Sequence, residues 1–544
     1  MSPDFEIDLG PEGPMAYRLL RAGQRRTISS FLAARSDLRG AQQARLERIL
    51  SQMRGTDFGR AHDLSRVRTL DDLAHSAPIR SYADLQPWFD RIIEGQSQVL
   101  TREPVRMLLE TSGTTGRPKL LPCTRSWEQS VSAAQAIWVL RMVADHPEIR
   151  DGQALTVVSP EVHSHSVGGL PIGSNTGRMH ARQPWFVRAR YPIPDAVYAL
   201  KPSVLKWYAL LRFALQAKIT TITTANPSTI LLMCRLLEQW RLPLSRDLEA
   251  GTLRHGPARR LGRLERFRLE RGLRRVAPPA DFRPGRIWPL KLVNCWKGRP
   301  AGYFTSRLPE ALGTRAPIRE VGITASEGYF ALPLGDDWPG GVMWPLGHVL
   351  EFIGDDGKPR FGWQLETGER VRLVITTEAG LYRYDLADDL LVVGHSGQLP
   401  VLRFVGKTGR WLNATGEKVT EVQVSTAMHR AVHAAGVSTI AGFSAHTAWA
   451  EVPCVEVAVE GVSAAQAATL AAVFDAALRG ENIEYDAKRE SGRLASARVV
   501  VVPDGTFVRW RAARVADGAP DGQVKDPILS TSDEEWSRVM AACS

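Results

Sequence analysis

One short loop constrains this chain more than any other feature of its sequence. Residues 109–119 read LETSGTTGRPK, so a strand-like run gives way to small polar residues and then to a lysine. Gly113 and Gly116 lack a Cβ and let backbone N–H groups approach an anion, while Lys119 neutralises negative charge. The hydroxyl donors of the loop are Ser112, Thr114 and Thr115. The loop therefore predicts a phosphate-binding site.

This loop differs from the common nucleoside-triphosphate loop G-x-x-x-x-G-K-[ST]. Only two residues separate Gly113 from Gly116, and neither Ser nor Thr follows Lys119. Kinase and GTPase classes are disfavoured for this reason. A plain Gly/Thr-rich surface turn would explain flexibility, but not the order S-G-T-T-G-x-P-K.

The remaining sequence predicts a layered α/β protein of more than one domain. A chain of 544 residues is too long for one ordinary core. From about residue 105, strand-like runs such as VRMLLE, ALTVVS, TITTA and LKLVNCW alternate with helical stretches. We expect an N-terminal unit at 1–406, with a helical lead-in over about 1–100 and a β-rich subdomain at about 342–406, and a small α+β domain at 407–544.

Composition argues against several other classes. Apolar residues make up 44% and charged residues 23%, which is ordinary for a soluble globular protein. The start has no signal-peptide pattern, and no uncharged apolar run approaches the roughly 18 residues of a spanning helix. We expect a cytoplasmic protein without a membrane span. The five scattered cysteines predict reduced thiols, and His163-x-His165 has no further ligands that would indicate zinc.

The net charge of +11 is concentrated in the arginine-rich segment Arg254–Val276. Apolar residues interleave with the arginines at near-helical spacing, which predicts an amphipathic surface helix with a solvated charged face. Because no nucleic-acid motif accompanies the segment, we expect no nucleic-acid partner. A helix beside an anionic nucleotide site is the alternative. The apolar residues are Leu261, Leu264, Phe267, Leu269 and Leu273.

The phosphate loop resembles that of the adenylate-forming superfamily, which includes acyl-CoA synthetases, luciferases and peptide-synthetase adenylation domains. Residues 322–330, GITASEGYF, resemble the aromatic-Gly-x-Thr-Glu segment of that superfamily. The resemblance implies that Glu327 is a catalytic ligand of Mg²⁺ and that Ser326 lies at the nucleotide. Ile323 departs from the pattern, because a tyrosine often stands there against the adenine.

A third segment, GLYRYDLAD at 380–388, resembles the Tyr-Arg-x-Gly-Asp segment of the superfamily. It implies that Asp388 binds the ribose hydroxyls, a role that suits a carboxylate with two acceptor oxygens. Ala387 replaces the usual glycine. Without the resemblance, such an aspartate would be interpreted as ordinary turn chemistry.

Over most of its length the chain resembles the Gretchen Hagen family of acyl-acid amido synthetases. The resemblance rests on GTDFGRAHDL, APIRSYADLQPWFDRIIEGQ, GLPIGSNTGR, IWPLKLVNCW, GLYRYDLADDL, FVGK with GEKVTE, and DGQVKDPIL. It implies that Lys525 reaches the α-phosphate during adenylation. It also places Lys407, where arginine is commoner, at the interdomain hinge beside the nucleotide.

The implied activity is ATP- and Mg²⁺-dependent. The enzyme would activate a small carboxylic acid as acyl-AMP, release pyrophosphate, and join the acyl group to an amine or amino acid. One alternative is an acyl-CoA synthetase, which differs in the acceptor, and another is a nucleotide-binding protein without catalysis. For Trp207, Tyr208 and Phe213, helical spacing favours a core role over an acid pocket.

Overall fold

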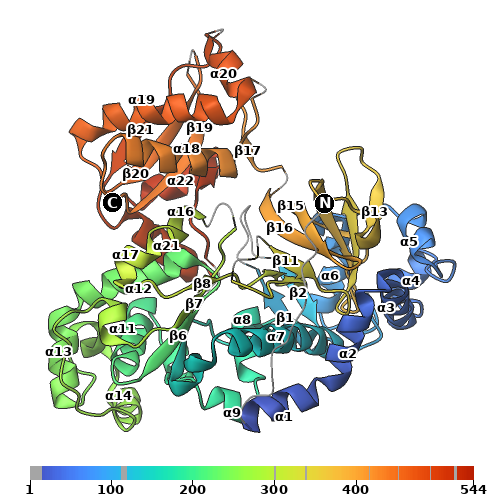
Figure 1. The fold of residues 1–544 in the computed structure, drawn as a ribbon, viewed down its shortest axis with the longest axis horizontal. Coiled ribbons are helices and arrows are strands. Elements are labelled where there is room, and N and C mark those ends of the chain that lie inside the picture. The colour runs from blue at the N-terminus through green and yellow to red at the C-terminus, as the bar shows by residue number, and fades with distance from the viewer. Residues whose placement is uncertain are drawn as a thin grey trace.

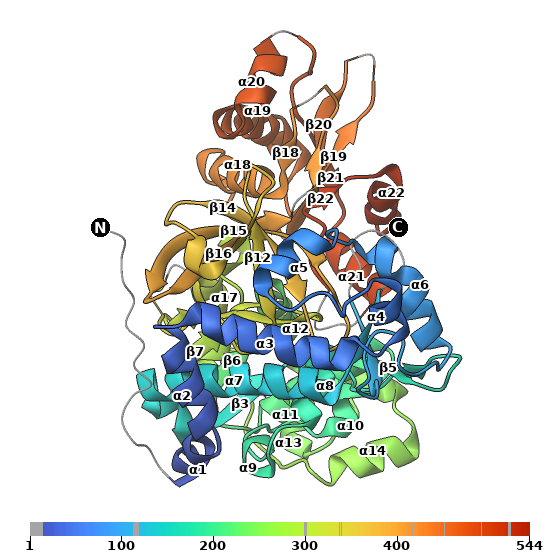
Figure 2. The ribbon, with the colours of Figure 1, turned by 90° about the vertical axis from the view of Figure 1, so that its right-hand side faces the viewer.

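The computed structural model describes residues 15–111, 119–298, 302–336, 338, 340–407, 409–415, 417–450, 452–490, 492–519 and 524–543. Figures 1 and 2 show a helical lead-in, two small sheets, a large antiparallel sheet and a C-terminal α+β unit. The lead-in contains α1 (Met15–Gly23), α2 (Arg25–Ala34), α3 (Leu38–Met53), α4 (Asp57–Ala61), α5 (Leu70–Ser76) and α6 (Tyr82–Ile93). Capping boxes start α5 at Thr69 and α6 at Ser81, because each cap pairs with an aspartate three residues on.

The predicted phosphate loop connects the two strands of a hairpin. Strands β1 (Met107–Glu110) and β2 (Leu120–Cys123) pair antiparallel, and β1 also pairs with β5 (Pro171–Gly173), which pairs with β4 (Ser164–His165). Helix α7 (Arg125–Asp145) follows β2, with the Thr124 hydroxyl as its N-cap. The loop is therefore fixed at both ends by a sheet.

A parallel sheet lies beside this hairpin and carries the next connections. It consists of β3 (Gln153–Thr156), β6 (Ile219–Thr223), β7 (Leu292–Asn294) and β8 (Ile318–Arg319), in that spatial order. The helices between its strands are α8 (Asn175–Ala181), α9 (Trp185–Arg188), α10 (Asp195–Tyr198), α11 (Ser203–Ala214), α12 (Pro227–Gln239), α13 (Arg241–Ala250), α14 (Arg263–Glu270), α15 (Pro284–Ile287), α16 (Gly302–Thr305) and α17 (Leu308–Leu312). Trp207, Tyr208 and Phe213 are buried in α11, so the core interpretation is confirmed.

The largest sheet brings distant parts of the sequence next to one another. Its antiparallel order is β13-β12-β14-β15-β16-β11-β10-β9. The strands are β9 (Ile323–Ala325), β10 (Gly328–Leu332), β11 (Gly341–Met343), β12 (Val349–Ile353), β13 (Pro359–Phe361), β14 (Arg370–Thr376), β15 (Tyr384–Ser396) and β16 (Leu399–Lys407). Burial alternates along β15, as expected for a strand with one face on the core. That core also contains the lead-in helices.

The C-terminal unit begins beyond two short strands, β17 (Trp411–Leu412) and β18 (Val419–Thr420). Its sheet has the order β21-β20-β19-β22, formed by Arg498–Val502, Cys454–Glu460, Gly442–Ala448 and Leu529–Ser530. Its helices are α18 (Glu421–Ala434), α19 (Ala464–Glu481), α20 (Ile483–Glu490), α21 (Thr506–Ala516) and α22 (Asp533–Ala541). The predicted α/β class is confirmed.

The arginine-rich segment departs from its prediction. Only α14 is α-helical within it, between Gly262 and Gly272. Leu261 and Leu269 are buried as expected of an apolar helix face, but Leu264 and Phe267 are 63% and 62% exposed. The continuous amphipathic helix is therefore wrong, because glycines interrupt the pattern and tertiary contacts select which apolar residues are covered.

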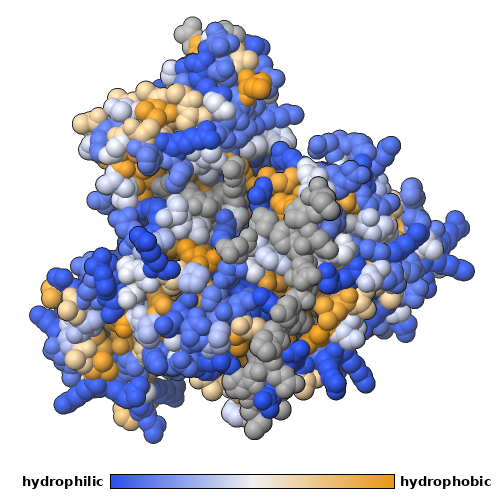
Figure 3. All heavy atoms as spheres, in the orientation of Figure 1, coloured by the Kyte–Doolittle hydropathy of each residue, from blue (hydrophilic) through white to orange (hydrophobic). Residues whose placement is uncertain are grey.

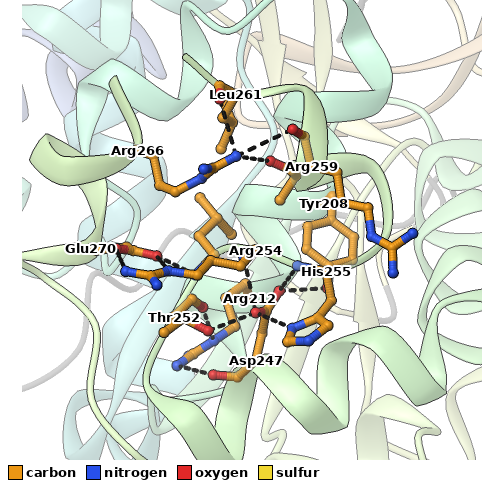
Figure 4. Close-up of polar contacts among 12 residues, drawn as sticks. Tyr208, Arg212, Asp247, Thr252, Arg254, His255, Arg259, Leu261, Arg266 and Glu270 are labelled. Carbon is orange, nitrogen blue, oxygen red and sulfur yellow. Dashed lines mark hydrogen bonds and ion pairs between the residues drawn. The ribbon is translucent and has the colours of Figure 1, made fainter. Parts of the chain in front are cut away.

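A fully buried carboxylate, Asp247, ties this segment to the body (Figure 4). It accepts hydrogen bonds from the Tyr208 hydroxyl and the Thr252 hydroxyl, both at 2.8 Å, and from the backbone N–H groups of Arg254 and His255 at 2.9 and 3.0 Å. Burial raises the pKa of Asp247, but hydrogen bonds from Arg254, His255 and Thr252 outweigh burial and hold the pKa below the ordinary value of 3.8.

We expect Asp247→Asn to lower the free energy of unfolding by about 1.5–3 kcal/mol, the range for hydrogen bonds to a charged group. Because the folded-state pKa is depressed, the stabilisation is present above pH 3.8 and is lost as pH falls through the lower folded-state value. Urea unfolding between pH 3 and 7 measures both effects. The matched control is Asp517→Asn, whose side chain is 64% exposed. Equal changes in the two variants would contradict the role of Asp247.

Candidate active site

The phosphate loop is closed at its base, and its lysine is held by aromatic residues. Ser112, Gly113, Thr114, Thr115 and Gly116 lie outside the described residues. At the neck, Thr111 N–H donates to the Lys119 carbonyl at 3.0 Å, and Lys119 N–H donates to the Thr111 hydroxyl at 3.3 Å. The Lys119 ammonium donates to the Tyr384 hydroxyl at 3.2 Å and lies 5.1 Å from the Tyr82 ring centre. Burial lowers the pKa of Lys119, while Glu327 opposes that shift.

Ser326 and Glu327 form the turn between β9 and β10, and both are buried. The indole N–H of Trp127 on α7 donates to the Glu327 carbonyl at 2.9 Å and fixes this turn. Burial raises the pKa of Glu327, against the opposing charges of Lys407 and Lys119. A buried carboxylate with a raised pKa gains from any cation that binds beside it.

Asp388 and Lys407 face each other across neighbouring strands. They are register partners in β15 and β16, and their side chains form an ion pair. The Lys407 ammonium also donates to the Leu386 carbonyl at 2.9 Å. Burial works to lower the pKa of Lys407, but Asp388 and Glu327 outweigh burial, so the pKa is raised. Ala387 adopts φ +54°, a left-handed conformation that favours glycine.

Lys525 reaches the same region from the C-terminal unit. Its ammonium lies 5.1 Å from the ring centre of Trp296, which follows β7. The adjacent Val524 carbonyl accepts from the Asn226 side chain at 3.1 Å, so this segment is held against the N-terminal part. Desolvation and the positive charge of Lys407 lower the pKa of Lys525, whose exposed surface faces a cavity. The structure thus brings together residues that are more than a hundred positions apart.

A cavity of about 610 Å³ lies between the C-terminal unit and the rest of the molecule and is lined by residues of both. Its position is the junction between the upper lobe and the lower body in Figure 1. Ligand sites commonly measure roughly 300–1,000 Å³, so this one suits a small molecule. The lining includes Trp296, Glu320, Ile323, Asp388, Lys407, Trp510 and Lys525.

Sequence interpretation missed Glu320, which organises one wall of the cavity. Its half-buried carboxylate accepts hydrogen bonds from four backbone N–H groups, at distances of 2.6–3.2 Å. The donors are Lys297, Gly298, Val321 and Gly322. Gly322 has φ +99°, and a Cβ there would lie 2.5 Å from the Ala331 carbonyl oxygen. No sequence signal distinguishes Glu320, because its partners are backbone groups. Trp296, in contrast, lies within the quoted segment IWPLKLVNCW.

Other predicted residues have ordinary structural roles. The His163 ring lies 2.9 Å from the Glu110 carboxylate. Among the described residues, no group of three or more His, Cys, Asp or Glu side chains is arranged to hold a metal. Cys123, Cys295 and Cys454 are buried thiols. No helix in the described part of the chain is long and apolar enough to cross a membrane.

The fold is shared with solved adenylate-forming ligases. An acyl acid amido synthetase, GH3.15, superposes with a TM-score of 0.83 at 18% identity, covering 99% of this chain and 97% of that chain. A 2-hydroxyisobutyryl-CoA ligase in complex with 2-HIB-AMP superposes with a TM-score of 0.53 at 12% identity, covering 99% and 97%. These likenesses define the class of fold.

Sequence comparison identifies the family within this class. The models of the GH3 family N-terminal, central and C-terminal domains match residues 27–316, 342–407 and 422–534, so the chain belongs to the GH3 family. A probable indole-3-acetic acid-amido synthetase from Oryza sativa subsp. japonica is 27% identical over 90% of this chain and 85% of its own length. A jasmonoyl-L-amino acid synthetase from Nicotiana attenuata is 23% identical over 75% and 76%. The Gretchen Hagen resemblance is thereby confirmed.

Proposed function

We propose that this protein is an ATP-dependent acid–amine ligase that forms an amide through an acyl-AMP intermediate. The observation that carries the proposal is the convergence of Asp388, Lys407 and Lys525 on one cavity, in a chain of the GH3 family. Lys119 and Glu327 are electrostatic neighbours of this group. Relatives named as indole-3-acetic acid-amido and jasmonoyl-L-amino acid synthetases support an amino acid as the acceptor.

In the proposed first half-reaction, the protein's charged groups hold ATP and the acid together. The loop at 112–116 with Lys119 binds the phosphates, and Ser326 lies at the nucleotide. The Asp388 carboxylate, oriented by Lys407, accepts hydrogen bonds from the ribose hydroxyls. Lys525 stabilises the charge that develops on the α-phosphoryl oxygens when the carboxylate attacks.

The residues present fit Mg²⁺, the metal that this chemistry implies. Glu327 would supply an oxygen ligand of the hard type that Mg²⁺ prefers, and burial raises the pKa of its carboxyl in spite of the nearby charges of Lys407 and Lys119. When bound, the ion would neutralise phosphate charge beside the reacting group. Lys119 and Lys407 supply the remaining positive charge on the protein side.

In the proposed second half-reaction, an uncharged amine attacks the acyl carbonyl, the bond from the acyl carbon to the phosphate oxygen breaks, AMP leaves, and the nitrogen loses a proton. Closure of the cleft excludes water. We place the mobile domain at 407–544, with the hinge at Lys407. Rotation of this domain would let one cavity serve both half-reactions. The Lys407 side chain forms an ion pair with Asp388. A substitution of Lys407 would therefore remove this ion pair in addition to any effect on the backbone of the hinge. We further propose that the protein acts in the cytoplasm.

The function is tested by pyrophosphate release from ATP and Mg²⁺ over a panel of aryl and aliphatic acids, followed by mass detection of products. We expect acid-dependent pyrophosphate release and an amide that forms only when an amino acid or another amine is added. A thioester that forms with CoA, without any amide, would assign the enzyme to the acyl-CoA synthetases. Nucleotide binding without pyrophosphate release for any acid would favour a non-catalytic protein.

A further inference from the structure

Helix α14 presents two large apolar side chains to solvent within a ring of arginines. Leu264 and Phe267 are 63% and 62% exposed. At 100° per residue, their directions differ by about 60°, and Arg271 projects between them. The Arg271 guanidinium lies 5.9 Å from the Phe267 ring centre. The exposed face therefore has an apolar centre that arginine side chains border directly.

The charge around this centre has one sign. Every residue of 259–275 is described, and among them Glu265 is the one exposed acidic residue. On the helical wheel Glu265 projects about 130° away from the middle of the face. Glu270 is half-buried and pairs with Arg254, so its charge is neutralised. The seven exposed basic residues are Arg259, Arg260, Arg263, Arg268, Arg271, Arg274 and Arg275.

This face is held firmly by the body of the protein (Figure 4). Leu269 is buried on the opposite side of α14, and Arg266 donates to the carbonyls of Ala258, Arg259 and Leu261 at 3.1–3.2 Å. The Asp247 network anchors the preceding segment. Leu264 and Phe267 thus protrude from an ordered element, and their exposure costs hydrophobic free energy unless a partner covers them.

The location of the face leaves the catalytic cavity accessible. In Figures 1 and 2, α14 lies at the bottom of the molecule, at the end away from α19 and α20, whereas the cavity adjoins the C-terminal unit. Figure 3 shows a mostly hydrophilic surface with scattered hydrophobic residues over the lobe that carries α13 and α14. A partner on α14 would therefore not obstruct the active site.

We propose that this face docks the enzyme on the surface of an anionic lipid membrane. An interfacial helix places its apolar side chains at the boundary between headgroups and acyl chains and its arginines among the headgroups. The basic residues add electrostatic attraction to anionic lipid. A nucleic acid would use the arginines but gains little from Leu264, which neither stacks on bases nor contacts phosphates. The membrane is therefore the partner that uses the whole face.

The test is co-sedimentation of the full chain with phosphatidylcholine vesicles and with vesicles in which part of the lipid is phosphatidylserine. We expect binding to the anionic vesicles that weakens as salt rises. Arg263→Gln/Arg268→Gln should weaken it by more than about tenfold, since each arginine contributes about fivefold. Leu264→Ser/Phe267→Ser should weaken it by a similar factor. The matched control is Ile483→Ser, an 86% exposed residue on α20, which should bind like the unchanged protein.

Three outcomes would overturn the proposal. In the first, the unchanged protein fails to bind anionic vesicles. In the second, the Leu264→Ser/Phe267→Ser variant binds these vesicles as well as the Ile483→Ser control does. In the third, the α14 variants lose binding to duplex DNA while their binding to vesicles is unaffected. The last result would assign the face to nucleic acid. Pyrophosphate release by the variants in the absence of vesicles should match that of the unchanged protein, which separates docking from the proposed catalysis.

Discussion

Replacement of Lys525 by alanine is expected to slow acyl-AMP formation by about 10²–10³-fold, the usual cost of removing one preorganised charge-stabilising group. The ammonium lies in the cavity that Asp388 and Lys407 also line, and its contact with Trp296 holds it there. Only the first half-reaction proceeds by attack at phosphorus. Amide formation from supplied acyl-AMP should therefore change much less.

ATP–pyrophosphate exchange measures the first half-reaction, and amide yield from synthetic acyl-AMP measures the second. The matched control is Lys358→Ala, which removes an exposed ammonium from the loop between β12 and β13. Equal losses in both half-reactions for Lys525→Ala would give this lysine a structural role.

Replacement of Lys407 by methionine is expected to destabilise the fold and to weaken ATP binding together. Methionine retains the length of the side chain but leaves the Asp388 carboxylate, 6% exposed, without its ion-pair partner. Breaking a fully buried pair costs about 3–5 kcal/mol. The cost here falls toward the lower end, because the Lys407 side chain remains 33% exposed to the cavity.

A double-mutant cycle separates stability from function. Lys407→Met/Asp388→Asn removes the isolated charge, so it should regain most of the lost unfolding free energy while ATP affinity stays low. Urea unfolding and nucleotide titration are the two measurements. If Asp388→Asn alone left ATP affinity unchanged, the proposed ribose contact would be wrong.

Local patterns were sufficient for the secondary structure around the site. The sequence predicted a loop that follows a strand-like run, and the structure adds a second strand after it, so that the loop connects β1 and β2. The start of the large sheet at β9 was not predicted, because β9 and β10 are short and their sequences do not stand out from the segment before them.

Interactions between distant residues were beyond the reach of local patterns. Lys407 was predicted as a hinge residue, yet the structure adds an ion pair with Asp388 that depends on the register of β15 and β16. Glu320 carries no sequence signal, since backbone N–H groups bind it. The near-helical spacing of the apolar residues in Arg254–Val276 predicted a buried helix face, but Leu264 and Phe267 are exposed.

The sequence by itself determined the chemical groups that the chain can offer. These are a glycine-rich loop with its lysine, the carboxylates of Glu327 and Asp388, and Lys525 near the C-terminus. These depend on residue type and short spacing, which local sterics and hydrogen-bonding capacity control. Only the tertiary structure decided which of them share a cavity, which charges are paired, and which apolar residues remain exposed. Those properties depend on strand register, domain placement and burial, and burial sets the energetic weight of every charge.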